Sequence, residues 1–224
     1  MGTIINATAI IIGGFIGMIL KEKIPSGLQT LLMEALGLIC MALGMQMALK
    51  GEKFLALVFS MVIGGVIGEL IGIHEALEKF SIKIEGKFAK EQNIFAKGFL
   101  TASLLYCIGP MTIMGSLQDG LGQIPQILYT KSLLDGTASI ALASALGIGV
   151  IFSAFPVLIV QGSITLFARV LNPFLTDLVV QEMTAVGGIL VLGIALNLLN
   201  IKQIKIANLI PALFLIPFFV YVFP

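Results

Sequence analysis

Two oppositely charged side chains lie in a stretch that is otherwise almost free of charge. Lys131 and Asp135 are four residues apart, and the 33 residues between Asp135 and Arg169 carry no charge. On a helix, a spacing of four places both side chains on one face, where they can pair. A charge at the centre of a bilayer costs about 2.5–3.5 kcal/mol on insertion scales, so such charges are rare and tend to be functional. The pair predicts a cation or proton site at Asp135, held by Lys131; the alternative is a salt bridge that only permits insertion.

A helix-breaking step stands just upstream, at Gly109-Pro110 in an apolar segment rich in hydrogen-bonding groups. Proline lacks an N–H and its ring opposes the carbonyl one turn back, at Tyr106. Carbonyls freed at a broken helix can coordinate a cation or a dipolar substrate. The alternative is a proline kink repaired by neighbouring Ser and Thr. The candidate site residues of this segment are Thr101, Ser103, Cys107, Gly109, Pro110, Thr112 and Gln118.

Other polar residues are candidates for the same site. Asp119 closes the broken span, and a hairpin would bring it close to Lys131 and Asp135 as a mouth or gate. Gln161 lies centrally in a later apolar span, where an unpaired amide costs roughly 2–7 kcal/mol and must face the bundle, as a substrate contact or as a link between helices. Three residues are weaker candidates: Asn6, Glu34 and Glu182.

Motifs of soluble enzymes are absent from the sequence. There is no Walker A loop, no GxGxxG after a strand, no HExxH and no cluster of Cys and His, with a single histidine in the chain. We therefore expect no enzymatic activity, no cofactor and no bound metal. The net charge of +1 and the lack of a basic tract argue against nucleic acid as a partner.

Composition places these residues in a membrane. The 224 residues are 58% hydrophobic and only 11% charged, whereas a soluble domain carries about 25% charged residues. Spanning segments must be helical, because isolated strands leave backbone groups unpaired in lipid. The sequence predicts an all-α polytopic bundle, with the bilayer as its main partner.

Apolar length predicts about seven or eight spans in a single integral membrane domain, residues 1–224. A hairpin in place of the fifth and sixth would leave six or seven. The eight segments are Thr3–Leu20, Leu28–Leu49, Phe54–Ile73, Gly98–Leu117, Ile127–Phe152, Phe155–Leu171, Val179–Ile201 and Ile206–Phe223. Residues 74–97 are polar with apolar positions at helical spacing, which predicts an amphipathic linker helix at the membrane surface.

Two further patterns concern the arrangement of the spans. An offset of 148 residues aligns Gly14 with Gly162 and Glu34 with Glu182. It suggests inverted repeats, residues 1–73 and 150–224, around a central segment 98–149, as in many secondary transporters. Glycines at small-xxx-small spacing, such as Gly13 with Gly17, allow close helix packing inside the bundle or in a homodimer.

The chain resembles the YdfK/YqgA-like bacterial inner-membrane proteins, a family of unknown function. The resemblance rests on Ile5-Asn6-Ala7, Gly13-Gly14, the segments Thr101–Ser103 and Cys107–Pro110, Leu117–Leu121, Lys131–Gly136, Gly147–Gly149 and Gln161-Gly162. It implies a multi-pass protein of the bacterial inner membrane and supplies no substrate.

The residues themselves favour a small secondary transporter for an ion or a small polar solute, coupled to a cation through Asp135 or Asp119. An oligomeric channel and a non-transporting scaffold or accessory subunit are the alternatives.

Overall fold

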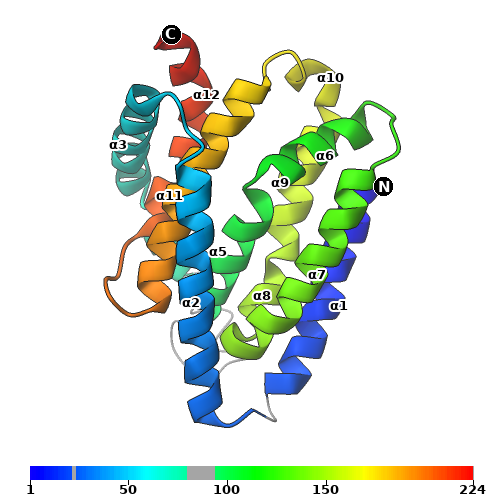
Figure 1. Cartoon of the computed structure of the whole chain (residues 1–224), viewed down its shortest axis with the longest axis vertical. Helices are drawn as coiled ribbons and strands as arrows, with labels where there is room; N and C mark the ends of the chain where they lie inside the picture. Colours follow the sequence, from blue (N-terminus) through cyan, green and yellow to red (C-terminus); the bar gives the residue numbers. More distant parts are fainter. Residues whose placement is uncertain (22–23, 80–93, 224) are drawn as a thin grey trace. The chain divides into compact units, whose positions relative to one another are not determined.

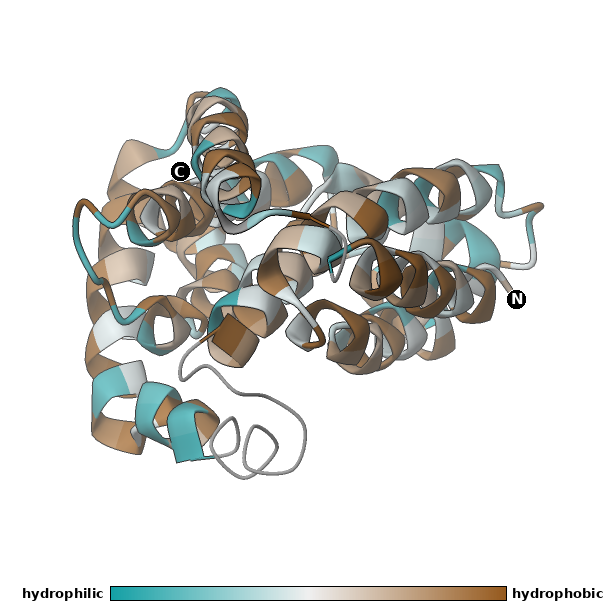
Figure 2. Ribbon diagram, turned by 90° about the horizontal axis from the view of Figure 1, so that it is seen from below, coloured by the Kyte–Doolittle hydropathy of each residue, from teal (hydrophilic) through white to brown (hydrophobic). Residues whose placement is uncertain are grey.

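The protein is a polytopic bundle of α-helices, as the sequence predicts. We describe it from a computed structural model, in which residues 1–21, 24–79 and 94–223 are placed, and all elements in these ranges are helical. Apolar residues run along most of the helices (Figure 2). Residues 80–93 lie outside the described part, and with them most of the predicted amphipathic linker 74–97.

The described residues form two compact units. The first unit comprises residues 1–33 and 91–173, and the second comprises residues 34–90 and 174–224. The first contains α1 (Gly2–Lys21), the start of α2 (Ser26–Ala48), α5 (Ile94–Cys107), α6 (Pro110–Gly120), α7 (Gln126–Leu146), α8 (Gly149–Phe152), α9 (Ala154–Leu166) and α10 (Ala168–Leu171). The second contains the rest of α2, α3 (Phe54–Ile71), α11 (Asp177–Leu198), the 3₁₀ helix η1 (Ile206–Leu209) and α12 (Ala212–Val222) (Figure 1).

Five helical segments of the described chain are long and apolar enough to cross a membrane, or six if the bent pair α5–α6 counts as one span. The predicted boundary between the fifth and sixth spans is misplaced. The chain breaks at Gly147, where φ is 74°, and α8 and α9 together form an apolar segment from Gly149 to Leu166. Sequence reasoning missed this boundary because no charged residue marks it.

In the first unit, α1 packs along α7 over most of its length (Figure 1). A Cβ on Gly13 would overlap the carbonyl oxygen of Gly136, and one on Gly17 would overlap that of Ile140. Small residues therefore let the two backbones approach closely, which is how helices associate when lipid offers no hydrophobic driving force. The glycine stripe of α1 therefore packs against another helix of the same chain.

The bent pair α5–α6 supplies the predicted broken helix. The two helices meet at 60°, α5 ends at Cys107 and Pro110 is the first residue of α6. Gly109 between them has φ 143° and ψ 155°, a conformation open only to glycine. The Gly-Pro step thus encodes the break locally, since glycine permits the turn and proline suits the first position of a new helix.

In the second unit, α2 packs antiparallel to α11, and α3 packs antiparallel to α12. In the α2–α11 pair, Gly37 faces Leu199 and Gly51 faces Ala185. An offset of 148 residues carries Gly37 to Ala185 and Gly51 to Leu199, so the offset maps one contact onto the other. Residue 64 is carried to residue 212 by the same offset, and Gly64 of α3 lies directly against Ala212 of α12.

Candidate functional site

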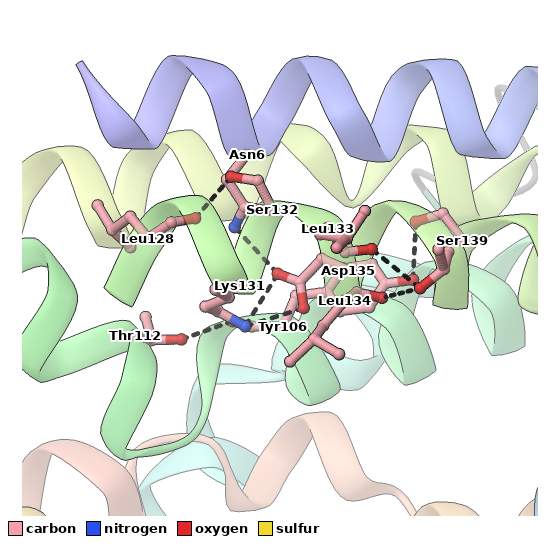
Figure 3. Close-up of polar contacts among 11 residues, drawn as sticks. Asn6, Tyr106, Thr112, Leu128, Lys131, Ser132, Leu133, Leu134, Asp135 and Ser139 are labelled. Carbon is pink, nitrogen blue, oxygen red and sulfur yellow. Dashed lines mark hydrogen bonds and ion pairs between the residues drawn. The ribbon is translucent and has the colours of Figure 1, made fainter. Parts of the chain in front are cut away.

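The first unit contains a buried ion pair, Lys131 and Asp135, which together with Asn6 we call the polar centre. The Nζ atom of Lys131 lies 3.0 Å from Oδ1 and 2.9 Å from Oδ2 of Asp135, and the two residues are 7% and 6% exposed. Both project from the same face of α7, as their spacing of four predicts (Figure 3). Removing two charges from water is expensive, and close pairing with further hydrogen bonds offsets that cost.

The further hydrogen bond comes from another helix. Asn6, on the first turns of α1, is fully buried and donates from Nδ2 to Oδ2 of Asp135 at 2.9 Å. Asp135 therefore lies between an ammonium group of its own helix and an amide of α1 (Figure 3). The Oδ1 atom of Asn6 is buried and has no hydrogen-bond partner among the described residues.

The broken helix lies beside this pair and contributes two of its neighbours (Figure 3). The Tyr106 hydroxyl, at the end of α5, is hydrogen-bonded to Ser139 at 2.8 Å, and Ser139 is one turn beyond Asp135 on α7. The Tyr106 carbonyl, which the proline ring opposes, accepts a hydrogen bond of 2.8 Å from the Thr112 hydroxyl. This carbonyl is thus repaired by a neighbouring threonine, as the structural alternative for the kink requires.

Hydroxyl groups link three helices of the first unit. Thr165 of α9 contacts the hydroxyl of Thr3 on α1 at 3.5 Å and donates to the Ser116 carbonyl of α6 at 3.3 Å. Each of these residues has a polar residue three or four positions away on its own helix: Asn6 on α1, Thr112 on α6 and Gln161 on α9. Of these three, Asn6 is hydrogen-bonded to Asp135.

Gln161 is the least satisfied of these side chains. It is fully buried, and neither its Nε2 nor its Oε1 atom has a hydrogen-bond partner among the described residues. The hydroxyls of Ser103 and Ser116 are also buried without a partner there. Each unsatisfied buried polar group costs about 1–3 kcal/mol, so these three side chains lower the stability of the first unit.

The remaining candidate residues of the first unit make no hydrogen bond to Lys131 or Asp135. Thr101 is buried in α5 and Cys107 is half-buried beside the break. The Gln118 side chain accepts a long contact of 3.5 Å from the Ile127 N–H, across the α6–α7 connection. Asp119 does not join Lys131 and Asp135: its carboxylate accepts from the amine of Met1 at 2.9 Å and the N–H of Gly2 at 3.0 Å, and so caps the start of α1.

Glu182 and Glu34 belong to the second unit and differ from each other. Glu182 is fully buried, and its Oε1 atom accepts from the N–H groups of Glu52 at 2.6 Å and Lys53 at 2.9 Å, at the start of α3. A carboxylate at a helix N-terminus satisfies free N–H groups and complements the helix dipole. Glu34 is exposed. Neither takes part in the polar centre around Asp135.

Sequence reasoning missed one charged cluster and two hydroxyl groups. In the second unit, Lys205 contacts Glu69 at 2.8 Å and Glu75 at 2.7 Å, and these hydrogen bonds raise the pKa of Lys205. In the first unit, Ser139 and Thr165 were missed because their partners are distant in sequence. No group of three or more His, Cys, Asp or Glu side chains able to hold a metal occurs in the described ranges.

Fold and site together define a polytopic helical membrane protein with a buried, charge-paired polar centre beside a broken helix. The chain belongs to the family described as "Protein of unknown function (DUF554)", whose model matches residues 1–221. It is 38% identical to the "Uncharacterized membrane protein YdfK" of Bacillus subtilis (strain 168), over 99% of this chain and 96% of that protein. It is 28% identical to the "Uncharacterized protein YqgA" of Escherichia coli (strain K12), over 96% and 94%. No solved structure matches the chain.

Proposed function

We propose that the protein is a small secondary transporter for an ion or a small polar solute in the bacterial inner membrane. The observation that carries the proposal is the Lys131–Asp135 pair, buried beside the break at Gly109-Pro110 and joined by Asn6 from another helix. Polar groups at a broken helix inside a membrane bundle are the usual setting of a translocation site.

The unsatisfied groups around the pair support a binding role over a purely structural one. Helix-linking polar residues gain about 0.6 kcal/mol on average from their hydrogen bonds. Gln161 makes no such bond among the described residues, although it is fully buried. Its burial lowers stability without linking helices, whereas a transported solute that bonds to both ends of the amide would offset that cost.

The experiment is uptake into proteoliposomes containing the purified protein, with Na⁺, K⁺ and Li⁺ salts and a panel of labelled small solutes. We expect saturable uptake that shows counterflow, and Asp135→Asn abolishes it. The matched control is Asp119→Asn, the same change in a carboxylate that caps α1, which retains uptake. Folding of both variants is checked by size-exclusion chromatography and thermal melting.

Two results would contradict the proposal. Normal uptake by folded Asp135→Asn removes Asp135 from the transport site. Absence of flux for every ion and solute in the wild-type protein, with stable co-purification of a partner, indicates an accessory subunit instead. Single-channel steps in a planar bilayer, without counterflow, would indicate a channel.

A further inference from the structure

We infer that the polar centre binds a monovalent cation in exchange for a proton carried by Lys131. This inference rests on the proposed function and names its substrate class and coupling. Lys131 is the resident cation of the Asp135 site, and an incoming ion such as Na⁺ takes its place.

The balance of charge in the centre carries the inference. Asp135 supplies one negative charge and Lys131, bound to both of its oxygens, supplies one positive charge. The polar neighbours Asn6 and Thr112 are neutral. An additional cation would leave a net positive charge in a buried site, which costs several kcal/mol per ion. The site therefore accepts a cation only when Lys131 loses its proton or withdraws.

The neutral groups are suited to a dehydrated cation. The Oδ1 atom of Asn6 is a buried oxygen without a hydrogen-bond partner in the described chain. Asn6 already touches the Asp135 carboxylate through its Nδ2 atom, so its amide oxygen is close to the same place. Amide and carbonyl oxygens can replace the hydration shell of a monovalent ion. One carboxylate balances one elementary charge, which favours a monovalent ion over a divalent one.

The exchange step balances without another reactant. The cation binds to Asp135, the ammonium group of Lys131 becomes an amine, and the proton leaves to solvent on the same side. On the other side the cation departs, Lys131 takes up a proton and the ion pair re-forms. One cation moves one way for each proton that moves the other way, so the cycle transfers no net charge.

Other ionisable groups near the pair are few. Of the helices packed against α7, α5 presents Tyr106 and Cys107, both close enough to interact with the charge of Asp135. Helix α6 carries Asp119, which is bound to the start of α1. The ionisable side chain of α1, Lys21, lies at the far end of that helix, and α8 carries none. Tyr106→Phe and Cys107→Ser are therefore the controls for the origin of the proton.

The test uses proteoliposomes loaded with a pH-sensitive dye and given a Na⁺ gradient. We expect internal pH to change with Na⁺ flux in the wild-type protein, and the number of protons moved per Na⁺ to stay at one in Tyr106→Phe and Cys107→Ser whatever their rate of flux. Lys131→Arg keeps a cation beside Asp135, but a guanidinium stays protonated, so exchange falls to the level of protein-free liposomes. Lys131→Gln leaves the buried Asp135 carboxylate without its ammonium partner, so Asp135 itself takes up a proton and Na⁺ exchanges with that proton instead.

A second measurement does not depend on transport. Na⁺ is added to the detergent-solubilised protein in weakly buffered solution, and proton release is recorded. We expect one proton per bound ion in the wild-type protein, and neither Na⁺ binding nor proton release in Lys131→Arg, whose guanidinium stays protonated. Exchange by Lys131→Arg at the wild-type rate, or Na⁺ flux in the wild-type protein without proton movement, overturns this inference and leaves the transporter intact. Absence of all flux overturns the proposed function itself.

Discussion

Breaking the Lys131–Asp135 pair from one side should destabilise the first unit far more than removing the pair altogether. Two unit charges 2.9 Å apart attract by about 6 kcal/mol at an effective dielectric constant of 20. The cost of removing both charges from water cancels much of this attraction in the intact pair. An ion that loses its partner still bears its own desolvation cost, with no attraction to offset it. Measured costs for removing one partner of a buried pair are about 3–5 kcal/mol, and we expect Asp135→Asn and Lys131→Met each to fall in that range.

The double variant Lys131→Met, Asp135→Asn removes both charges and keeps similar volumes. Its asparagine can still accept the hydrogen bond that Asn6 donates. Neutral replacements of buried pairs are often as stable as the original, so the double variant should be more stable than either single variant. The coupling free energy of the cycle should reach at least about 3 kcal/mol, because neighbouring charges do not contribute additively.

The assay is reversible unfolding in mixed detergent micelles, with the free energy of unfolding of all four proteins measured at one pH. The exposed pair between Lys205 and Glu69 is the internal control, since its side chains are 49% and 58% exposed. Lys205→Gln should leave the unfolding midpoint close to that of the wild-type protein. Additive effects in the cycle, or an unchanged stability of Asp135→Asn, would mean that the pair is open to water and would refute the reasoning.

Two further substitutions test the packing around the site. Gly13→Ala should cost about 1–3 kcal/mol, because its Cβ would overlap the Gly136 carbonyl, whereas Gly162→Ala, with open space around it, should be neutral; equal melting temperatures would contradict close α1–α7 packing. Glu182→Ala should lower the free energy of unfolding by about 0.5–2 kcal/mol, because the N–H groups at the start of α3 lose their acceptor. Glu182→Gln keeps an acceptor oxygen and should regain much of that stability in the same unfolding assay. Equal stability of the two variants would contradict the capping role.

The parts of the site that depend on local chemistry were predictable from the sequence. The Lys131–Asp135 contact follows from helical spacing, and the break follows from the Gly-Pro step. By contrast, the hydrogen bond between Asn6 and Asp135 joins residues 129 positions apart. It depends on the register in which α1 packs against α7, and that register is set by Gly13 and Gly17 lying against α7. Asn6 was therefore only a weak candidate, and Ser139 was missed.

The offset of 148 residues shows how far a weak sequence signal extends. Few positions support the offset of 148 residues, yet it relates the contacts of Gly37 and Gly51 in the second unit. The equivalence of whole halves, residues 1–73 and 150–224, stays a prediction. Aligned residues can also differ in role: Glu182 is buried as a helix cap, while Glu34 is exposed. Symmetry of packing does not require symmetry of chemistry.

Buried polar residues of two kinds occur in the described chain, those with hydrogen bonds and those with an atom left without a partner, and the second kind includes the Oε2 atom of Glu182 as well as Gln161. Asn208 and Thr184 in the second unit, like Thr112 in the first, have the hydrogen bonds that a structural role needs. Gln161 does not, and Asn6 uses only its donor. A chain that folds in lipid loses stability at every such atom, and apolar side chains of similar size would avoid the loss. Retaining the unsatisfied amides of Asn6 and Gln161 is costly to the folded state alone, and under the proposed function a bound ion or polar solute would supply the missing interactions.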